Sequence, residues 1–77
     1  MSAQQFKAKA RKHWSRWLPS RVRDLREAGE LESTLQVAAV NAQEKMLELM
    51  AQGFRAHEAE EVALAEYILL RPEPGVQ

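Results

Sequence analysis

The positions of the apolar residues near the start of the chain predict an amphipathic helix. These residues recur every three or four positions, the spacing that places side chains on one face of a helix. They are Ala3, Phe6, Ala10, Trp14, Trp17 and Leu18. Lysines and arginines occupy many of the other positions, so the predicted helix, residues 1–18, is basic as well as amphipathic. Pro19 disfavours helical conformation in the residue before it, and we expect the helix to end near Trp17 or Leu18.

The middle of the chain predicts a short helical segment followed by a long helix. Pro19 suits the first turn of a segment over residues 19–29, and Gly29 suits a left-handed stop at its end. Residues 30–52 contain no proline or glycine and many strong helix formers, which predicts a long central helix. Its expected apolar face consists of Leu31, Leu35, Ala38, Ala39, Ala42, Met46, Leu49 and Met50. A heptad-like spacing also runs from Leu25 to Leu49, so a single helix that continues through Gly29 is an open alternative.

The C-terminal part predicts a further helix over residues 56–70. Gly53 suits the end of the long helix, and Pro72 ends the last helix, which leaves residues 71–77 as a tail. Because the connection around Gly53 is short, the two helices should pack as an antiparallel hairpin. Residues expected among its contacts are Leu35, Ala42, Met46, Leu49, Val62 and Tyr67. The chain, residues 1–77, is thus predicted to be one small all-α domain of three or four helices.

Charge is sorted along the chain, although the formal net charge of the whole protein is zero. Residues 1–26 contain eight basic residues and one acidic residue, a net charge of +7, whereas residues 27–77 contain three basic residues and ten glutamates, a net charge of −7. Because electrostatic fields are screened over about 10 Å at ordinary salt, the basic part should act as a local binding surface. The residues expected to contact a partner are Lys9, Arg11, Lys12, Trp14, Arg16, Trp17, Arg21 and Arg23.

The segment KARKHWSRW combines cations with two tryptophans, a pattern typical of proteins that bind phosphates and stack bases on an indole ring. Nucleic acid is therefore one candidate partner. A second interpretation is structural: Phe6, Trp14 and Trp17 attach the basic helix to the hairpin, and the cations stay in solvent. A third is a protein surface, including the acidic half of the same chain or of a second copy in a homodimer. An anionic membrane is the least favoured partner, because the acidic body would be repelled by it.

Size and composition argue against an enzyme and against a metal or cofactor site. A chain of 77 residues is too short for a deep substrate cavity, and the absence of cysteine removes thiolate ligands and disulfides. His57 and Glu61 form the only histidine–carboxylate pair at helical i, i+4 spacing, and the H-E-x-x-H zinc motif is absent. We therefore expect no catalytic residue, no metal and no cofactor. No apolar run approaches the ~20 residues of a membrane span, so we expect a soluble, cytoplasmic protein.

The stretch from Met46 to Glu73, MLELMAQGFRAHEAEEVALAEYILLRPE, resembles the C-terminal hairpin of short uncharacterised proteins of bacterial phages and other mobile elements. The similarity lies in the helix-forming residues around Gly53 and in the ending Tyr67, Leu69, Leu70, Pro72 and Glu73. It implies an accessory or inhibitory protein that acts by binding. The resulting prediction is a small non-enzymatic binding protein that acts through protein–protein contacts. Nucleic-acid binding through the basic, tryptophan-bearing helix is the alternative.

Overall fold

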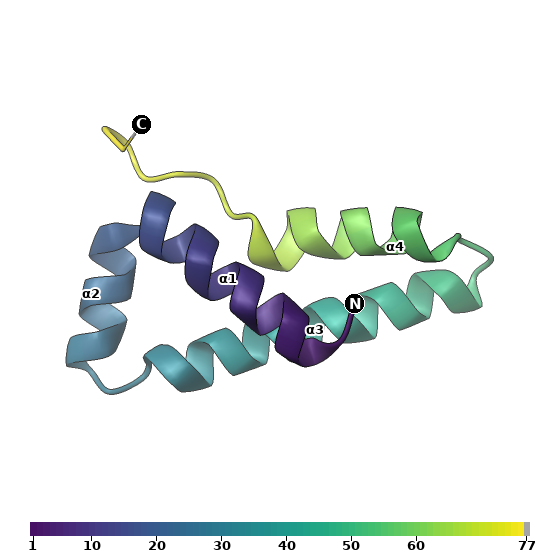
Figure 1. Cartoon of the computed structure of the whole chain (residues 1–77), viewed down its shortest axis with the longest axis horizontal. Helices are drawn as coiled ribbons and strands as arrows, with labels where there is room; N and C mark the ends of the chain where they lie inside the picture. Colours follow the sequence, from purple (N-terminus) through teal and green to yellow (C-terminus); the bar gives the residue numbers. More distant parts are fainter. Residues whose placement is uncertain (77) are drawn as a thin grey trace.

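The computed structural model describes residues 1–76 and shows an all-α protein, as predicted. The helices are α1 (Ala3–Trp17), α2 (Pro19–Glu27), α3 (Leu31–Ala51) and α4 (Ala56–Ala63), and α4 continues directly into a π-helical turn, η1 (Leu64–Ile68). Figure 1 shows α3 as the longest element, with α1 running antiparallel to it and α4 returning alongside α3 after a tight turn. The described residues contain no strand. The predicted central helix and C-terminal hairpin are therefore confirmed.

The helix boundaries follow from local capping. Ser2 begins α1 with a reciprocal capping box, in which the Gln5 N–H donates to Ser2 Oγ (3.2 Å) and the Ser2 N–H donates to Gln5 Oε1 (2.7 Å). Leu18 leaves the helical conformation directly before Pro19, which occupies the first position of α2. The N-terminal helix thus ends at Trp17, inside the expected boundary.

Gly29 separates α2 from α3, so the alternative of one continuous helix is wrong. Its φ of +71° is left-handed, and the N–H groups of Gly29 and Glu30 donate back to the carbonyls of Arg26 (3.1 Å) and Leu25 (2.8 Å). This pair of hydrogen bonds is a Schellman motif, which ends a helix without leaving its last carbonyls unpaired. Gly53 (φ +101°) ends α3 in the same way, with Phe54 N–H donating to the Leu49 carbonyl at 3.0 Å.

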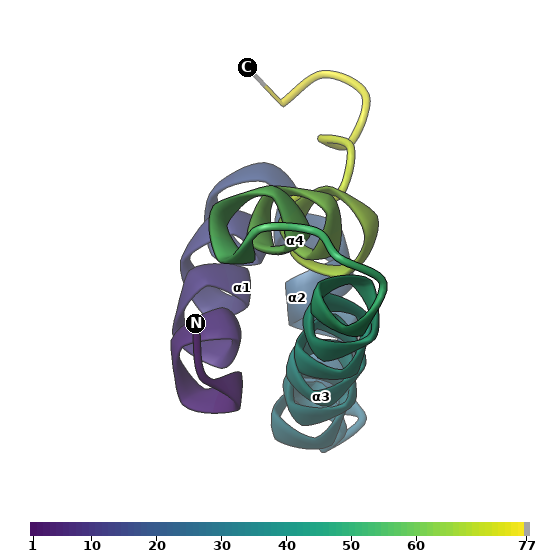
Figure 2. The same ribbon diagram turned by 90° about the vertical axis from the view of Figure 1, so that its right-hand side faces the viewer.

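The core lies where α1, α3 and the α4–η1 helix meet. Its buried residues are Phe6, Ala10, Trp14, Leu18, Val22, Leu31, Leu35, Ala39, Ala42, Met46, Leu49, Ala59, Ala63 and Ile68, with Val62 and Tyr67 packed at its edge. Alanines predominate where α3 faces α4, which lets the two backbones approach closely. Figure 2, an end-on view, shows α1 and α3 side by side with α4 lying across them. The principal extents of 40 × 26 × 14 Å describe a thin molecule that is one to two helices deep.

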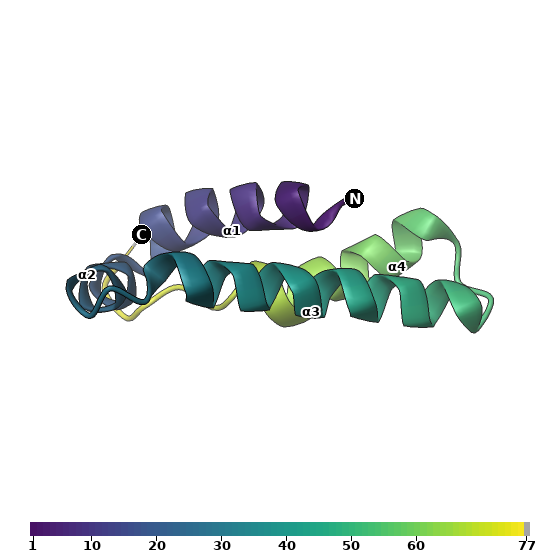
Figure 3. The same cartoon turned by 90° about the horizontal axis from the view of Figure 1, so that it is seen from below.

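Two details at the ends of the long hairpin differ from the sequence-based expectation. The last helix widens into η1 and ends at Ile68 rather than at residue 70, because the Leu69 N–H donates to the carbonyl of Leu64, five residues back, at 2.7 Å. Met50 was expected on the apolar face of the central helix, but its side chain is exposed. Figure 3 shows the reason: α1 covers only part of the length of α3, and the last turns of α3 extend beyond it.

Candidate interaction groove on the basic helix

Two side chains of α1 fasten it to the end of η1. The Trp14 indole N–H donates to the Ile68 carbonyl at 2.8 Å, and His13 Nε2 donates to the Leu70 carbonyl at 2.9 Å. The last carbonyls of a helix have no partner inside the helix, so Trp14 supplies the donor that the Ile68 carbonyl lacks there, and His13 supplies one for a carbonyl two residues beyond the end of η1. Trp14 is only 2% exposed, and its indole is part of the core. Trp14 thus attaches α1 to the rest of the protein, as the structural interpretation of the tryptophans predicted. Its indole ring is not available for stacking on a base.

A shallow groove runs along α1 where this attachment is made. Its volume is about 280 Å³, and its lining residues are Lys9, Lys12, His13, Arg16, Trp17 and Leu69. Within residues 1–76, no carboxylate lies at ion-pair distance from Lys9, Lys12 or Arg16. We call this site the basic groove.

The apolar part of the basic groove comes from two elements. Trp17 at the end of α1 is half-buried, and Leu69, just after η1, is 45% exposed. The Arg16 guanidinium lies 4.4 Å from the centre of the Trp17 ring, a cation–π contact that holds charge next to the indole. The groove therefore offers apolar surface beside cations on one face, a combination that suits anionic groups attached to an apolar scaffold.

Other predicted binding residues are engaged inside the molecule. Arg11 makes a bidentate ion pair with Glu32 at the start of α3, with both N–O distances 2.6 Å, and Lys7 lies 3.5 Å from the same carboxylate. The hydrogen bonds from Arg11 lower the pKa of Glu32 to about 2, and those bonds also raise the pKa of Arg11. Because these groups are exposed, the pair fixes the orientation of α1 more than it stabilises the fold.

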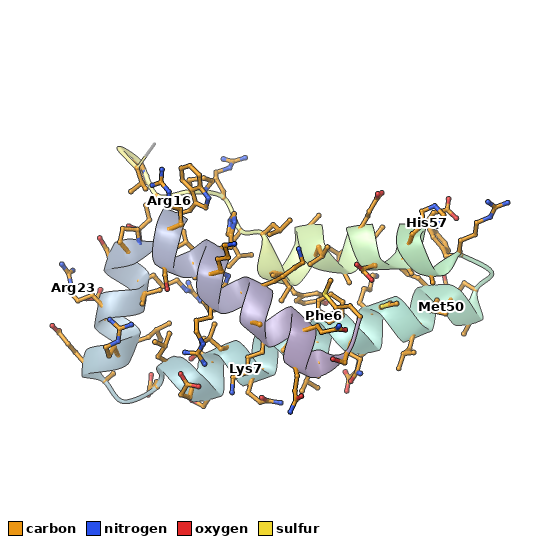
Figure 4. All side chains as sticks on the ribbon, in the orientation of Figure 1. Phe6, Lys7, Arg16, Arg23, Met50 and His57 are labelled. Carbon is orange, nitrogen blue, oxygen red and sulfur yellow. The ribbon has the colours of Figure 1, made fainter. Side chains whose placement is uncertain are left out.

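The arginines of α2 lie apart from the basic groove. Arg23 pairs with the adjacent Asp24 at 3.2 Å and projects outward from α2 (Figure 4). The Arg21 guanidinium lies 5.6 Å from the centre of the Trp14 ring and lines a different recess, together with Tyr67. The eight residues expected to form one surface are thus divided. Lys9, Lys12, Arg16 and Trp17 share the groove, and the other four lie elsewhere.

The C-terminal tail adds contacts that the sequence did not predict. The Glu73 carboxylate accepts hydrogen bonds from the backbone N–H groups of Ser20 (3.2 Å) and Arg21 (3.0 Å) and so caps α2, whose N-cap residue Leu18 has no capping side chain. The Glu73 N–H in turn donates to the Trp17 carbonyl at 2.9 Å. Burial raises the pKa of Glu73, but the hydrogen bonds from Arg21 and Ser20 together with the positive charge of Arg23 outweigh it, and the pKa is lowered overall.

His13 and Leu69 also belong to the groove although the sequence analysis did not select them. A lone histidine between lysines and a leucine after a helix carry no local signal, and only the packing of residues some 57 positions apart brings them together. Glu73 is a similar case, because its capping partners lie more than 50 positions earlier.

Within residues 1–76 no group of three histidine, aspartate or glutamate side chains is placed to hold a metal ion, and both His57 and Glu61 are exposed. None of the helices in this part of the chain is both long and apolar enough to cross a membrane. In comparisons with known proteins, no family model, curated protein or solved structure matches this chain.

Proposed function

We propose that this chain is a small non-enzymatic binding protein that acts in the cytoplasm through protein–protein contacts at the basic groove. One observation carries the proposal: cations that have no carboxylate partner within residues 1–76 lie directly beside the half-buried Trp17 and the exposed Leu69. A phosphate backbone needs cations but gains little from an exposed leucine. A protein segment with acidic residues next to an apolar side chain satisfies both parts of the groove. An accessory or inhibitory protein of a phage or mobile element, the class suggested by the resemblance of residues 46–73, would act in this way.

The two parts of the groove have different roles in binding. The exposed cations steer and orient an acidic partner, but each adds little affinity because solvent screens it. Affinity must come from covering Trp17 and Leu69, since burial of a large apolar side chain contributes about 1.5–3 kcal/mol. Tryptophan and arginine are also the residues most often found at the energetic centre of interfaces. A variant that loses the Trp17 ring should therefore lose more affinity than one that loses a single lysine.

The test compares two variants that change net charge equally. The groove variant carries Lys9→Glu with Lys12→Glu, and the control variant carries Arg23→Glu with Arg26→Glu on α2. All four side chains are exposed, so both variants should fold, as circular dichroism can verify. Affinity capture from cells of the source organism, with nucleic acid digested, should recover the same partner with wild type and control variant and lose it with the groove variant. Equal recovery by all three proteins would refute the proposal.

Nucleic acid remains the second candidate, because Lys9, Lys12 and Arg16 all face one groove on α1 with the Trp17 ring beside them. Three phosphate contacts predict a slope of about −2.7 in log affinity against log salt on duplex DNA, so a rise from ~50 to ~200 mM salt should weaken binding about 40-fold. The groove variant should flatten this slope by roughly two units. Absence of binding to single- or double-stranded DNA or RNA at ~50 mM salt would exclude this candidate and leave the protein partner.

A further inference from the structure

A second interaction surface lies at the opposite end of the molecule, on the last turns of α3. Leu47, Met50 and Phe54 are large apolar side chains that the described chain covers only in part, with 57%, 39% and 43% of their surface exposed. They follow one another at intervals of three and four residues, so they continue a single line along α3 and into the turn after it. We call these three residues the tip patch.

The tip patch is exposed because α1 stops short of it. The N-terminal ammonium of Met1 lies 3.6 Å from the Met46 sulfur and 3.2 Å from Glu60, which places the beginning of the chain alongside the middle of the hairpin. Val40 and Gln43 precede Leu47 on the same line of α3 and are partly buried. Beyond Met46, α3 continues for more than a turn without α1 beside it.

The charges around the tip patch have the opposite sign to those of the basic groove. Glu44 and Glu48 flank Leu47 on α3, and Glu58 and Glu61 are exposed at the start of α4 across the turn. Lys45, Arg55 and His57 are also near this end, so the region is acidic but not purely so. The basic groove presents apolar side chains flanked by three cations, and the tip patch presents apolar side chains flanked by carboxylates.

These two surfaces cannot meet within one molecule. They lie at opposite ends of a body whose long axis is 40 Å, as the positions of Arg16 and Met50 in Figure 4 show. From this charge complementarity we infer that the chain associates head to tail with itself: the tip patch of one copy occupies the basic groove of the next. This inference names the partner of the proposed binding site and so rests on the proposed function.

The size and the placement of the two surfaces determine how tightly the copies associate and whether the contact is symmetric. The tip patch consists of three large apolar side chains, far fewer than the roughly 20–30 residues that each partner contributes to a standard interface. Binding should therefore be micromolar or weaker. Because the groove and the patch are different surfaces, the contact is heterologous, and each added copy leaves one free groove and one free patch for further growth.

The experiment is sedimentation of the full chain from about 1 µM to about 1 mM protein at low salt. The mass of wild type should rise above the monomer value of 8.8 kDa with concentration, and ~500 mM salt should reduce the rise. The groove variant and a tip variant, Leu47→Glu, should each remain monomeric. An equimolar mixture of the two should form a dimer and stop there, because one intact groove meets one intact patch and neither copy can extend the chain. Val37→Asn is the matched control: Val37 is 59% exposed on α3 outside both surfaces, and this variant should associate as wild type does.

Three outcomes would overturn the inference: a wild type that stays at 8.8 kDa throughout, a tip variant that associates normally, or a mixture that stays monomeric while wild type associates. If any of these occurs while the groove variant still loses its captured protein, the self-association fails and the proposed function is unaffected. If capture from cells does not depend on the groove, the proposed function fails as tested there, and the dimer in the mixture is then a separate result that shows only contact between two copies.

Discussion

The assignment of Trp14 to the core predicts a large and specific loss of stability on mutation. Trp14→Phe keeps a ring in the core but deletes the indole donor, which leaves the buried Ile68 carbonyl without its 2.8 Å partner. An unsatisfied buried acceptor costs about 1–3 kcal/mol. Trp14→Ala also removes the ring from a site that is 2% exposed, and the expected cost rises to about 3–5 kcal/mol. A domain of this length has a total stability of roughly 4–12 kcal/mol, so the alanine variant should lie near the edge of folding.

Urea unfolding followed by circular dichroism measures this loss, with Trp17→Phe as the matched control. Trp17 is half-buried and makes no side-chain hydrogen bond within residues 1–76, so its replacement should change stability by less than about 1 kcal/mol. Each variant also leaves a single tryptophan whose fluorescence reports its surroundings. Emission should lie at shorter wavelength when only Trp14 is present than when only Trp17 is present. If Trp17→Phe proved as destabilising as Trp14→Phe, the placement of the two indoles would be refuted.

Three further predictions concern the caps and the charges. Glu73→Gln should lower the melting temperature at neutral pH. Because the pKa of Glu73 is lower in the folded than in the unfolded state, the ionised carboxylate stabilises the fold fully above the unfolded-state pKa. The difference from wild type should vanish as the pH falls through the folded-state pKa. Gly53→Ala should destabilise by about 1 kcal/mol in urea unfolding, since alanine is strained at a φ of +101°. Glu32→Gln should lower the melting temperature slightly at low salt. The difference from wild type should disappear at high salt, and also as the pH falls to about 2, where the Glu32 carboxylate of wild type becomes protonated.

The helices could be predicted from the sequence because their causes are local. Apolar spacing, the proline after Leu18 and the glycines after α2 and α3 act within a few residues, and the structure places the boundaries close to those expected. The expected extension of the last helix to residue 70 was wrong because its cause is not local. Trp14 satisfies the last carbonyl of η1, and His13 satisfies the Leu70 carbonyl just beyond it. A sequence pattern cannot show that these donors come from a helix more than 50 residues away.

The binding surface was harder to predict than the fold, because a count of charges treats all cations alike. Lys12 follows Arg11 directly, yet the two side chains point about 100° apart around α1. Arg11 faces Glu32 on α3 and is neutralised there, whereas Lys12 faces the groove and finds no carboxylate within residues 1–76. Which cations remain free depends on the packing of α1 against α3, and that packing is set by buried apolar residues that carry no charge.

Ion pairs within the chain thus change the electrostatic field that an approaching partner encounters. With Lys7 and Arg11 both paired to the Glu32 carboxylate, the cations of α1 that have no carboxylate partner within residues 1–76 include the three at the basic groove, and exposed glutamates lie toward the other end of the molecule. Such a field acts before contact and orients an approaching partner, while the apolar side chains act only after water has been excluded. The two contributions should separate in kinetics: salt should mainly slow association, and Trp17→Ala should mainly speed dissociation. A partner whose dissociation responded to salt and not to Trp17 would be held by charge alone, as a nucleic acid is, and not by the apolar part of the groove.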